Sequence, residues 1–223
     1  MGDFFNLTNA NVKLYDGPVR NMDPTFGEAY FDKTRDTGYG GYNYDGRWKQ
    51  VAQSIIDRYG IKSGQRLLDT GCSKGFLLAD LSDLIPGIEL RGTEVSQYAI
   101  DKAHEKAKGL IDLVTDEKLP YPDNYFDFVA SINVLHFLTP EQAESGIREL
   151  LRVGKGEKNF FIQVDAFIND IERERLLAWA PIIKSALSVD EWLEMFDRVG
   201  YKGDYYWTFV RPQTPEKFKI QDA

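Results

Sequence analysis

Apolar residues along this chain gather in short runs, separated by longer segments with helical spacing. A continuous apolar run of four to eight residues is typical of a strand buried on both faces of a sheet. Runs bounded by turn residues predict six strands, at Arg66–Thr70, Glu89–Glu94, Leu110–Val114, Phe126–Ile132, Asn159–Val164 and Tyr201–Val210. A short segment of the tail, Phe218–Ile220, is a candidate for a last strand.

The segments between these strands carry helix signals. Trp48–Tyr59 has apolar residues at helical spacing and is followed by Gly60. Other helices are predicted at Gly75–Leu84, after Ser96, after Thr139 and Pro140, over Asp170–Leu187 with a kink or break at Pro181, and from the capping box Ser188/Glu191 to Gly200. Strands that alternate with helices predict an α/β fold with a doubly wound, mostly parallel sheet and helices on both faces.

The first part of the chain differs from the rest. Residues 1–46 are rich in Gly, Asn, Asp and Tyr and show little periodicity. This composition predicts an irregular arm with one short helix near Pro24–Arg35. Residues 47–223 carry the alternating pattern and form the predicted ligand-binding domain. A chain of 223 residues is long enough for a single α/β domain with an arm or lid.

Composition narrows the classes of protein that fit this chain. Apolar residues make up 43% and aromatic residues 13% of it, which is typical of a globular protein. The net charge of −8 disfavours a nucleic-acid partner, because duplex binding depends on clustered Lys and Arg. The single cysteine, Cys72, excludes an intrachain disulfide, and no apolar run is long enough to span a bilayer. We expect a cytoplasmic protein with no membrane partner. Its oligomeric state, a homodimer included, stays open.

The most informative motif is the turn Asp69-Thr70-Gly71-Cys72-Ser73-Lys74-Gly75, which joins a predicted strand to a predicted helix. Its glycines let the backbone approach a ligand closely. The dinucleotide pattern G-x-G-x-x-G is absent, because Ser73 and Phe76 stand at its second and third glycines. The acid at Asp69 disfavours an anionic pyrophosphate and favours a cationic ligand. A sulfonium with an ammonium group meets this requirement, so the turn indicates S-adenosylmethionine rather than NAD.

A second acidic position supports this interpretation. Glu94 ends the second predicted strand, 94 − 71 = 23 positions after Gly71. In nucleoside-binding α/β folds a carboxylate about 20 residues after the turn holds the ribose hydroxyls. Thr115-Asp116-Glu117 follows the third predicted strand, where an acid or amide can accept a hydrogen bond from an adenine amino group.

The chain resembles the class I S-adenosylmethionine-dependent methyltransferases, in the group with many small-molecule enzymes. The matching stretches are LLDTGCSKG, RGTEVSQYAIDKA, LPYPDNYFDFVASINVLHFL and LLRVGKGEKNFFIQV, within Trp48 to Tyr206. The resemblance implies a Rossmann-like seven-stranded sheet with S-adenosylmethionine as cofactor. It also implies roles for individual residues: Asp69, Gly71, Ser73 and Gly75 around the methionine part, Glu94 on the ribose, Asp116 on the adenine with Thr115 or Glu117 as alternatives, and Asn133 near the sulfonium.

Two candidates for a catalytic general base follow the fourth and fifth predicted strands. His136 lies at the expected mouth of the pocket, although it could equally hydrogen-bond a neighbouring loop as a structural group. Asp165 comes soon after Gln163, and both are expected on the substrate side. Asp165 could instead cap a helix or accept a hydrogen bond from the substrate. An alcohol or phenol acceptor needs such a base, whereas a neutral amine attacks unaided.

The segment 38–48 is rich in glycine and tyrosine. Its glycines allow bending, and Tyr39, Tyr42 and Tyr44 offer flat apolar faces with hydroxyl tips. We expect a lid over cofactor and substrate, with Arg47 as partner for the methionine carboxylate. A rigid surface loop packed by its own aromatic residues is the alternative. Trp179 is expected to line the opposite wall.

Together these features predict an enzyme that transfers a methyl group from S-adenosylmethionine to an O or N atom of a small-molecule metabolite. The first alternative is an NAD-linked oxidoreductase, which the missing glycines disfavour. The second is a non-catalytic S-adenosylmethionine-binding or scaffold protein. The acidic charge and the absence of an Asn/Asp-Pro-Pro-aromatic motif at Ser131–Val134 disfavour methylation of DNA or RNA. No cluster of His, Asp and Glu predicts a metal site.

Overall fold

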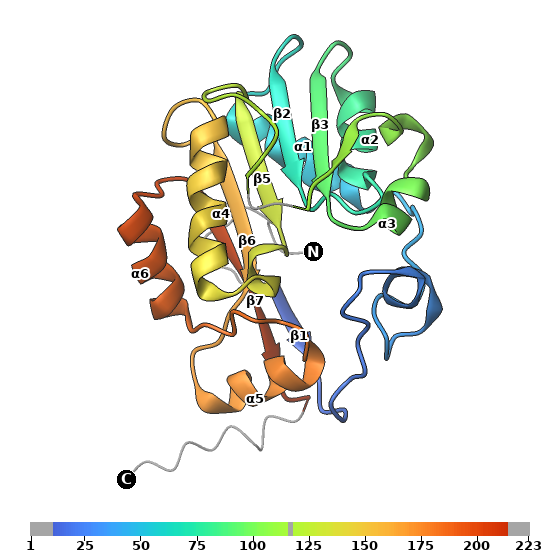
Figure 1. Cartoon of the computed structure of the whole chain (residues 1–223), viewed down its shortest axis with the longest axis vertical. Helices are drawn as coiled ribbons and strands as arrows, with labels where there is room; N and C mark the ends of the chain where they lie inside the picture. Colours follow the sequence, from blue (N-terminus) through green and yellow to red (C-terminus); the bar gives the residue numbers. More distant parts are fainter. Residues whose placement is uncertain (1–10, 116–117, 214–223) are drawn as a thin grey trace.

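A computed structural model describes residues 11–115 and 118–213, which form a seven-stranded sheet with helices on both faces (Figure 1). The strands lie in the order β1-β7-β6-β5-β2-β3-β4, and all neighbouring pairs are parallel. The predicted α/β class and sheet are confirmed. The strands are β1 Asn11–Leu14, β2 Arg66–Thr70, β3 Glu89–Glu94, β4 Ile111–Leu113, β5 Phe128–Ile132, β6 Phe160–Asp165 and β7 Asp204–Arg211.

The connections between strands contain six α-helices in the described residues: α1 Trp48–Tyr59, α2 Phe76–Leu84, α3 Gln97–Asp101, α4 Pro140–Val153, α5 Asp170–Trp179 and α6 Val189–Val199. Single turns of other helix types are η1 Ala29–Lys33, η2 Glu105–Ala107 and η3 Leu135–Phe137. The predicted caps at Ser96, Thr139 and Ser188 are confirmed, because each side-chain oxygen accepts a backbone N–H of the following turn.

The core has two layers, one on each face of the sheet. Helices α1 and α2 pack together on one face, and α4 and α6 on the other (Figure 1). The layer under α4 and α6 includes Phe126, Ile147, Phe160, Trp192 and Phe196, and the layer under α1 and α2 includes Ile55, Leu67, Leu78, Leu81 and Phe128. Each of these buried side chains contributes about 1.5–3 kcal/mol to stability. The sheet is therefore a rigid support for the loops at its carboxyl edge.

The last strand of the sheet differs from the sequence-based prediction. The edge strand β1 comes from the segment predicted to be irregular, and it pairs with β7. It has only four residues, of which three are exposed, so neither length nor alternation marks it in the sequence. The candidate strand Phe218–Ile220 lies outside the described residues. Residue 47 is therefore not a boundary of the sheet, and only the chain after β1 corresponds to the expected arm.

The segment 170–187 is also less helical than predicted. Helix α5 ends at Trp179, and Ala180 has φ −133° and ψ 69°. Pro181 explains this end, because a proline disfavours helical geometry in the residue before it and has no N–H to donate. The chain then runs without regular structure to the capping box at Ser188.

The arm, defined here as residues 15–46, packs beside the carboxyl edge of the sheet (Figure 1). Its single turn η1 buries Tyr30 and Phe31 against Ala99 of α3. The guanidinium of Arg20 is buried and donates to the backbone carbonyls of Trp179, Arg35 and Gly38. A single buried cation thus joins both halves of the arm to the end of α5.

Candidate functional site

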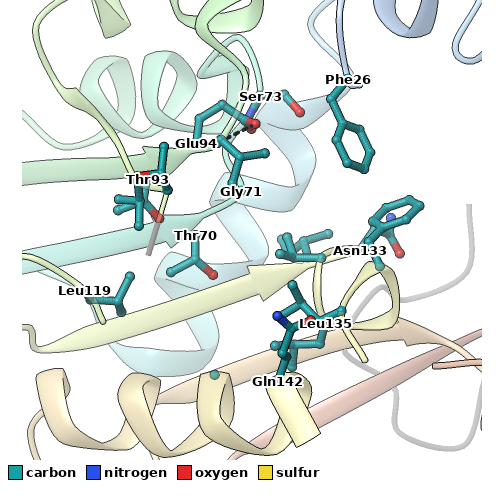
Figure 2. A pocket seen from close by; sticks show the side chains of 18 of the residues that line it. Phe26, Thr70, Gly71, Ser73, Thr93, Glu94, Leu119, Asn133, Leu135 and Gln142 are labelled. Carbon is teal, nitrogen blue, oxygen red and sulfur yellow. Dashed lines mark hydrogen bonds between the residues drawn. The ribbon is translucent and has the colours of Figure 1, made fainter. Parts of the chain in front are cut away.

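A cavity of about 340 Å³ lies at the carboxyl ends of β2, β3 and β5 (Figure 2). In the sheet, β3 and β4 lie on one side of β2, and β5, β6 and β7 lie on its other side. This reversal of strand order is where open α/β sheets bind ligands. The lining includes Phe26, Tyr30, Phe31 and Tyr39 from the arm, Gly71 and Ser73 from the turn, Glu94, Thr115, Asn133 and Gln142.

The turn after β2 approaches the cavity as closely as a backbone can. Gly71 has φ +65°, and a Cβ there would lie 2.3 Å from Val134 Cγ2. A Cβ on Gly75, with φ +71°, would lie 2.4 Å from the Cβ of Ala107. Both glycines are thus required by shape as well as by dihedral angle. Ser73 has φ +53°, a left-handed conformation that non-glycine residues adopt uncommonly.

Glu94 is buried at the end of β3, and its carboxylate lines the cavity. The carboxylate accepts three backbone N–H groups, from Ser73 at 2.8 Å, Val95 at 2.8 Å and Ser96 at 2.9 Å. Figure 2 shows the first of these bonds, which joins the turn after β2 to the end of β3. Burial raises the pKa of Glu94, and the three N–H groups oppose that rise. The bonds fix the orientation of an acid in the wall of the cavity.

Asp69 lies beside a second, smaller cavity of about 30 Å³, which shares Gly71, Ser73 and Asn133 with the large one. Burial, followed by the charge of Glu94, raises the pKa of Asp69 to about 8. Neither acid forms an ion pair in the described part of the chain. Two buried acids without a cation make this end of the site suitable for a positively charged ligand.

The structure brings Asn133 into the same site. It follows β5 with φ +59°, and it lines both cavities. Its Oδ1 atom is buried and has no hydrogen-bond partner. An unpaired buried acceptor is costly unless a ligand supplies the donor. Thr115 also lines the large cavity, whereas Asp116 and Glu117 lie outside the described residues.

The arm residues expected in the lid divide into two groups. Tyr39 lines both cavities, and Tyr42 lines the smaller one. Tyr44 instead donates its hydroxyl to Asp80 at 2.6 Å and does not line either cavity. Arg47 is exposed, pairs with Asp45 at 2.5 Å and is also absent from both linings. The structure therefore does not bring Arg47 to the place of a methionine carboxylate.

Sequence analysis missed three aromatic residues of the arm that line the large cavity: Phe26, Tyr30 and Phe31. In the sequence these three residues are marked only by their closeness to one another, in a segment with little hydrophobic periodicity. It also missed the ion pair of Lys74 with Asp32 at 2.7 Å, which ties the turn after β2 to the arm. The same Asp32 accepts the Tyr98 hydroxyl at 2.8 Å, so the arm is fixed to α3 as well.

His136 and Asp165 lie together behind the aromatic wall of the cavity. The Nδ1 atom of His136 accepts the backbone N–H of Asp165 at 3.0 Å, which places the ring proton on Nε2, 3.8 Å from Asp165 Oδ2. Burial lowers the pKa of His136 and outweighs the opposite effect of Asp165. A neutral ring whose basic nitrogen is already bonded is not free to accept a proton. The geometry therefore favours the structural alternative for His136.

Asp165 and Gln163 keep unused acceptor atoms. Asp165 Oδ1 and Gln163 Oε1 are buried without hydrogen-bond partners, although Gln163 donates to Thr208 at 3.1 Å. Neither residue is part of the cavity lining. Burial raises the pKa of the lining residues Tyr30 and Tyr39, and the charge of Asp165 adds to the rise in each. Asp165 therefore acts electrostatically on the aromatic wall of the cavity.

Trp179 does not line the cavity, contrary to the expectation that it forms the opposite wall. It packs under the arm, where the guanidinium of Arg20 lies 4.5 Å from its ring centroid. Helix α5 ends at Trp179 because Pro181 follows, so Trp179 lies at the end of the helix and not within a longer one.

Comparison with known proteins shows what the chain is similar to. Residues 68–162 match the family model described as a methyltransferase domain. Over this stretch the chain is similar to S-adenosylmethionine-dependent methyltransferases. It is 32% identical over 150 residues to a tRNA (carboxymethyluridine(34)-5-O)-methyltransferase of Arabidopsis thaliana, covering 66% of the chain and 34% of that protein. It is 31% identical over 116 residues to a ubiquinone/menaquinone biosynthesis C-methyltransferase of Photorhabdus laumondii, covering 48% and 44%.

Solved structures agree on the fold. The YcgJ protein of Bacillus subtilis superposes with a TM-score of 0.54 at 23% identity, covering 67% of each chain. A putative S-adenosyl-L-methionine-dependent methyltransferase of Methanococcus maripaludis gives a TM-score of 0.52 at 21% identity, covering 69% of this chain and 76% of that one. The chain spans only 34% to 42% of the length of the first two curated relatives.

The described residues fit S-adenosylmethionine as cofactor: Gly71, the buried Glu94 and Asn133 with its unpaired Oδ1 line the large cavity, and the buried Asp69 lines the smaller cavity beside it. No group of three or more His, Cys, Asp and Glu in the described ranges could hold a metal ion. Within those ranges there is also no helix with the length and apolar character to cross a membrane.

Replacing Gly71 by Ala tests the close approach of the turn. We expect Gly71→Ala to lose about 2–5 kcal/mol of unfolding free energy, from a positive φ and from the contact with Val134. The matched control is Gly109→Ala, which has φ +77° but open space around its Cβ and should lose only about 1–2 kcal/mol. Urea denaturation of both variants measures the difference, and equal losses would contradict the steric role of Gly71.

The raised pKa of Asp69 predicts proton release when a cationic cofactor binds. In the free protein Asp69 is mostly protonated at pH 7, because its pKa is about 8. A cation beside it favours the carboxylate and lowers that pKa. Affinity for S-adenosylhomocysteine, whose ammonium group remains charged, should therefore rise from pH 6 to 7.5 by up to about tenfold per pH unit. Calorimetry in buffers of different ionisation enthalpy measures the released proton, and Asp69→Asn should abolish both effects.

Proposed function

We propose that the protein transfers a methyl group from S-adenosylmethionine to an O or N atom of a small molecule. The observation that carries this proposal is the pair of buried acids, Asp69 and Glu94, around a glycine turn beside a cavity of about 340 Å³. The cofactor brings a cation and a nucleoside, and these are the two features that this arrangement accommodates.

The cofactor would be held by residues from three strand ends. Asp69, Gly71, Ser73 and Gly75 surround the methionine part, while Glu94 accepts the ribose hydroxyls. Thr115 lies on the adenine side. Asn133 lies near the sulfonium, which supplies an activated methyl carbon. Support comes from the linings, since Gly71, Ser73, Glu94, Thr115 and Asn133 all face one cavity.

The acceptor would bind on the side of the arm and β6. Phe26, Tyr30 and Phe137 supply an apolar wall that excludes water there. Asp165 is the candidate proton acceptor in this proposal: its Oδ1 atom is buried and unpaired, and the residue lies behind the cavity lining and not in it. His136 holds the backbone of Asp165 and presents a neutral ring to its carboxylate. A methyl acceptor that bears a proton on O or N would donate the hydrogen bond that Asp165 Oδ1 lacks.

One relative favours a second candidate, methylation of RNA. That relative is named a tRNA methyltransferase, and it is 32% identical over 150 residues. The net charge of −8 favours a small molecule instead, because a phosphate backbone needs clustered cations on the surface. The NAD-linked alternative has only the fold in its favour, and a non-catalytic role as a binding protein or scaffold is an outcome of the test below. The cytoplasmic location and a homodimer stay predictions.

Calorimetry followed by turnover tests the proposed function. S-adenosylhomocysteine should bind and NADH should not. A panel of small O and N acceptors, with bulk tRNA as a separate arm, should show methyl transfer to a small molecule only. On the acceptor found, Asp165→Asn should lower kcat about 10²–10⁴-fold without weakening cofactor binding. The control Asp170→Asn removes an exposed acid at the start of α5 and should change neither. NADH binding, or transfer to tRNA alone, would contradict the proposal.

The arm as a lid is tested by amide hydrogen exchange. Addition of S-adenosylhomocysteine should slow exchange in residues 36–48, since Tyr39 and Tyr42 line the cavities. Arg20→Gln should raise exchange in the same segment at least tenfold, because three backbone carbonyls lose a buried charged donor. The control Arg47→Gln removes an exposed cation and should have no such effect. Unchanged exchange on cofactor addition would rule out the lid.

A further inference from the structure

Three cations surround the ring of Trp179 at the junction of β1, the arm and α5. Lys13 Nζ lies 5.3 Å from the ring centroid, the Arg20 guanidinium carbon 4.5 Å and that of Arg35 5.6 Å. Tyr15 packs its edge against the same ring at 5.2 Å. Contact with an aromatic face stabilises a cation, but it does not neutralise the mutual repulsion of three.

The three charges are only partly compensated within residues 11–115 and 118–213, where the charge of Asp36 opposes the effect of burial on the pKa of Arg20. None of the three cations forms an ion pair there, in a protein whose net charge is −8. Of the neighbouring acids, Asp16 pairs with Arg175, and Asp36 accepts the backbone N–H of Asn21 without forming an ion pair in the described residues. Burial lowers the pKa of Arg20, and the positive charge of Arg35 lowers it further. The cluster therefore has no carboxylate in ion-pair contact with its cations among the described residues.

The donors that remain available belong to Lys13 and Arg35. Arg20 uses its nitrogens on three backbone carbonyls, so it supplies charge rather than contacts. Lys13 is half-buried, and no acceptor contacts its ammonium among the described residues. Arg35 is exposed and donates one Nη1 bond, to the Tyr39 carbonyl at 2.9 Å. Its other N–H groups form a planar fork that suits a carboxylate or phosphate.

The cluster adjoins the acceptor side of the site. Arg35 and Arg20 bind the carbonyls of Tyr39 and Gly38, and the Tyr39 ring lines both cavities. Lys13 is close enough to His136 for its charge to lower the pKa of that ring. His136 in turn contacts the backbone of Asp165. The cations thus lie outside both cavity linings and are joined to the large cavity through Tyr39.

We propose that Lys13 and Arg35, over the ring of Trp179, form a subsite for an anionic group of the methyl acceptor, a carboxylate or a phosphate monoester. This inference rests on the proposed function and narrows it to small acceptors that carry a negative charge at one end. Lys13 and Arg35 attract such a group, whereas the acidic cofactor end offers it no cation, so the charges also orient the acceptor.

Titration with inorganic phosphate and with malonate tests the subsite on the full chain. The indole N–H signal of Trp179, assigned with Trp179→Phe, should shift saturably, while sodium chloride at equal ionic strength should not shift it. Lys13→Gln and Arg35→Gln should each weaken binding about tenfold or more, because each removes a charged donor. The matched control Lys33→Gln removes an exposed arm cation that pairs with Glu28, and it should bind as the original protein does.

Each other outcome has a distinct meaning. Equal binding of both anions to the original protein and to Lys13→Gln would overturn the subsite. Binding of a short single-stranded RNA that depends on Lys13, without any response to phosphate or malonate, would overturn the small-anion assignment. Calorimetry with S-adenosylhomocysteine runs in parallel and reports on the proposed function and on folding. If the cofactor product fails to bind while the anions bind, the proposed function fails and the anion site stands by itself.

Discussion

The structure depends on one electrostatic constraint, the burial of Asp69 and Glu94 at neighbouring strand ends. Burial alone would drive both groups toward the neutral form, and the pKa of Asp69 is raised to about 8. Glu94 is held by three backbone N–H groups instead of by a cation. Because one of these donors is Ser73, the acid of β3 determines the shape of the turn after β2. The acids and the glycine turn are therefore one unit that is complete only with a positive ligand.

The arm contributes to the burial of these two acids. Acids with raised pKa values need a cover, and aromatic residues of the arm provide it at low conformational cost. Two cations hold this cover, and each is buried: Lys74 pairs with Asp32 from the turn side, and Arg20 binds carbonyls from the α5 side. Loss of either cation would leave buried polar groups unpaired. The cover is thus attached at two points, and the glycine-rich segment 38–48 follows both of them in the chain.

Sequence reasoning succeeded where local chemistry determines the structure. The bounds of β2 and β3 were predicted to the residue, because apolar runs end there in an acid or a turn. The capping box at Ser188 and the left-handed Gly200 are equally local signals. The edge strand β1 was missed because its stability comes from pairing with β7, some 200 positions away. Arg47 and Trp179 were misplaced for the same reason, since tertiary partners decide where an arm lies.

The remaining charges complete the site in a consistent way. Acids surround the cofactor end, and the unpaired cations Lys13, Arg20 and Arg35 gather outside both cavity linings. Between the two ends lie oxygen atoms that only accept hydrogen bonds, on Asn133, Gln163 and Asp165. A molecule that satisfies all three regions has a proton-bearing O or N at its centre and an anion at its far end. The anionic end of such a molecule would be attracted to the cations beside the arm and not to the acidic cofactor end. The electrostatic field of the protein would thereby align the nucleophile with the methyl carbon.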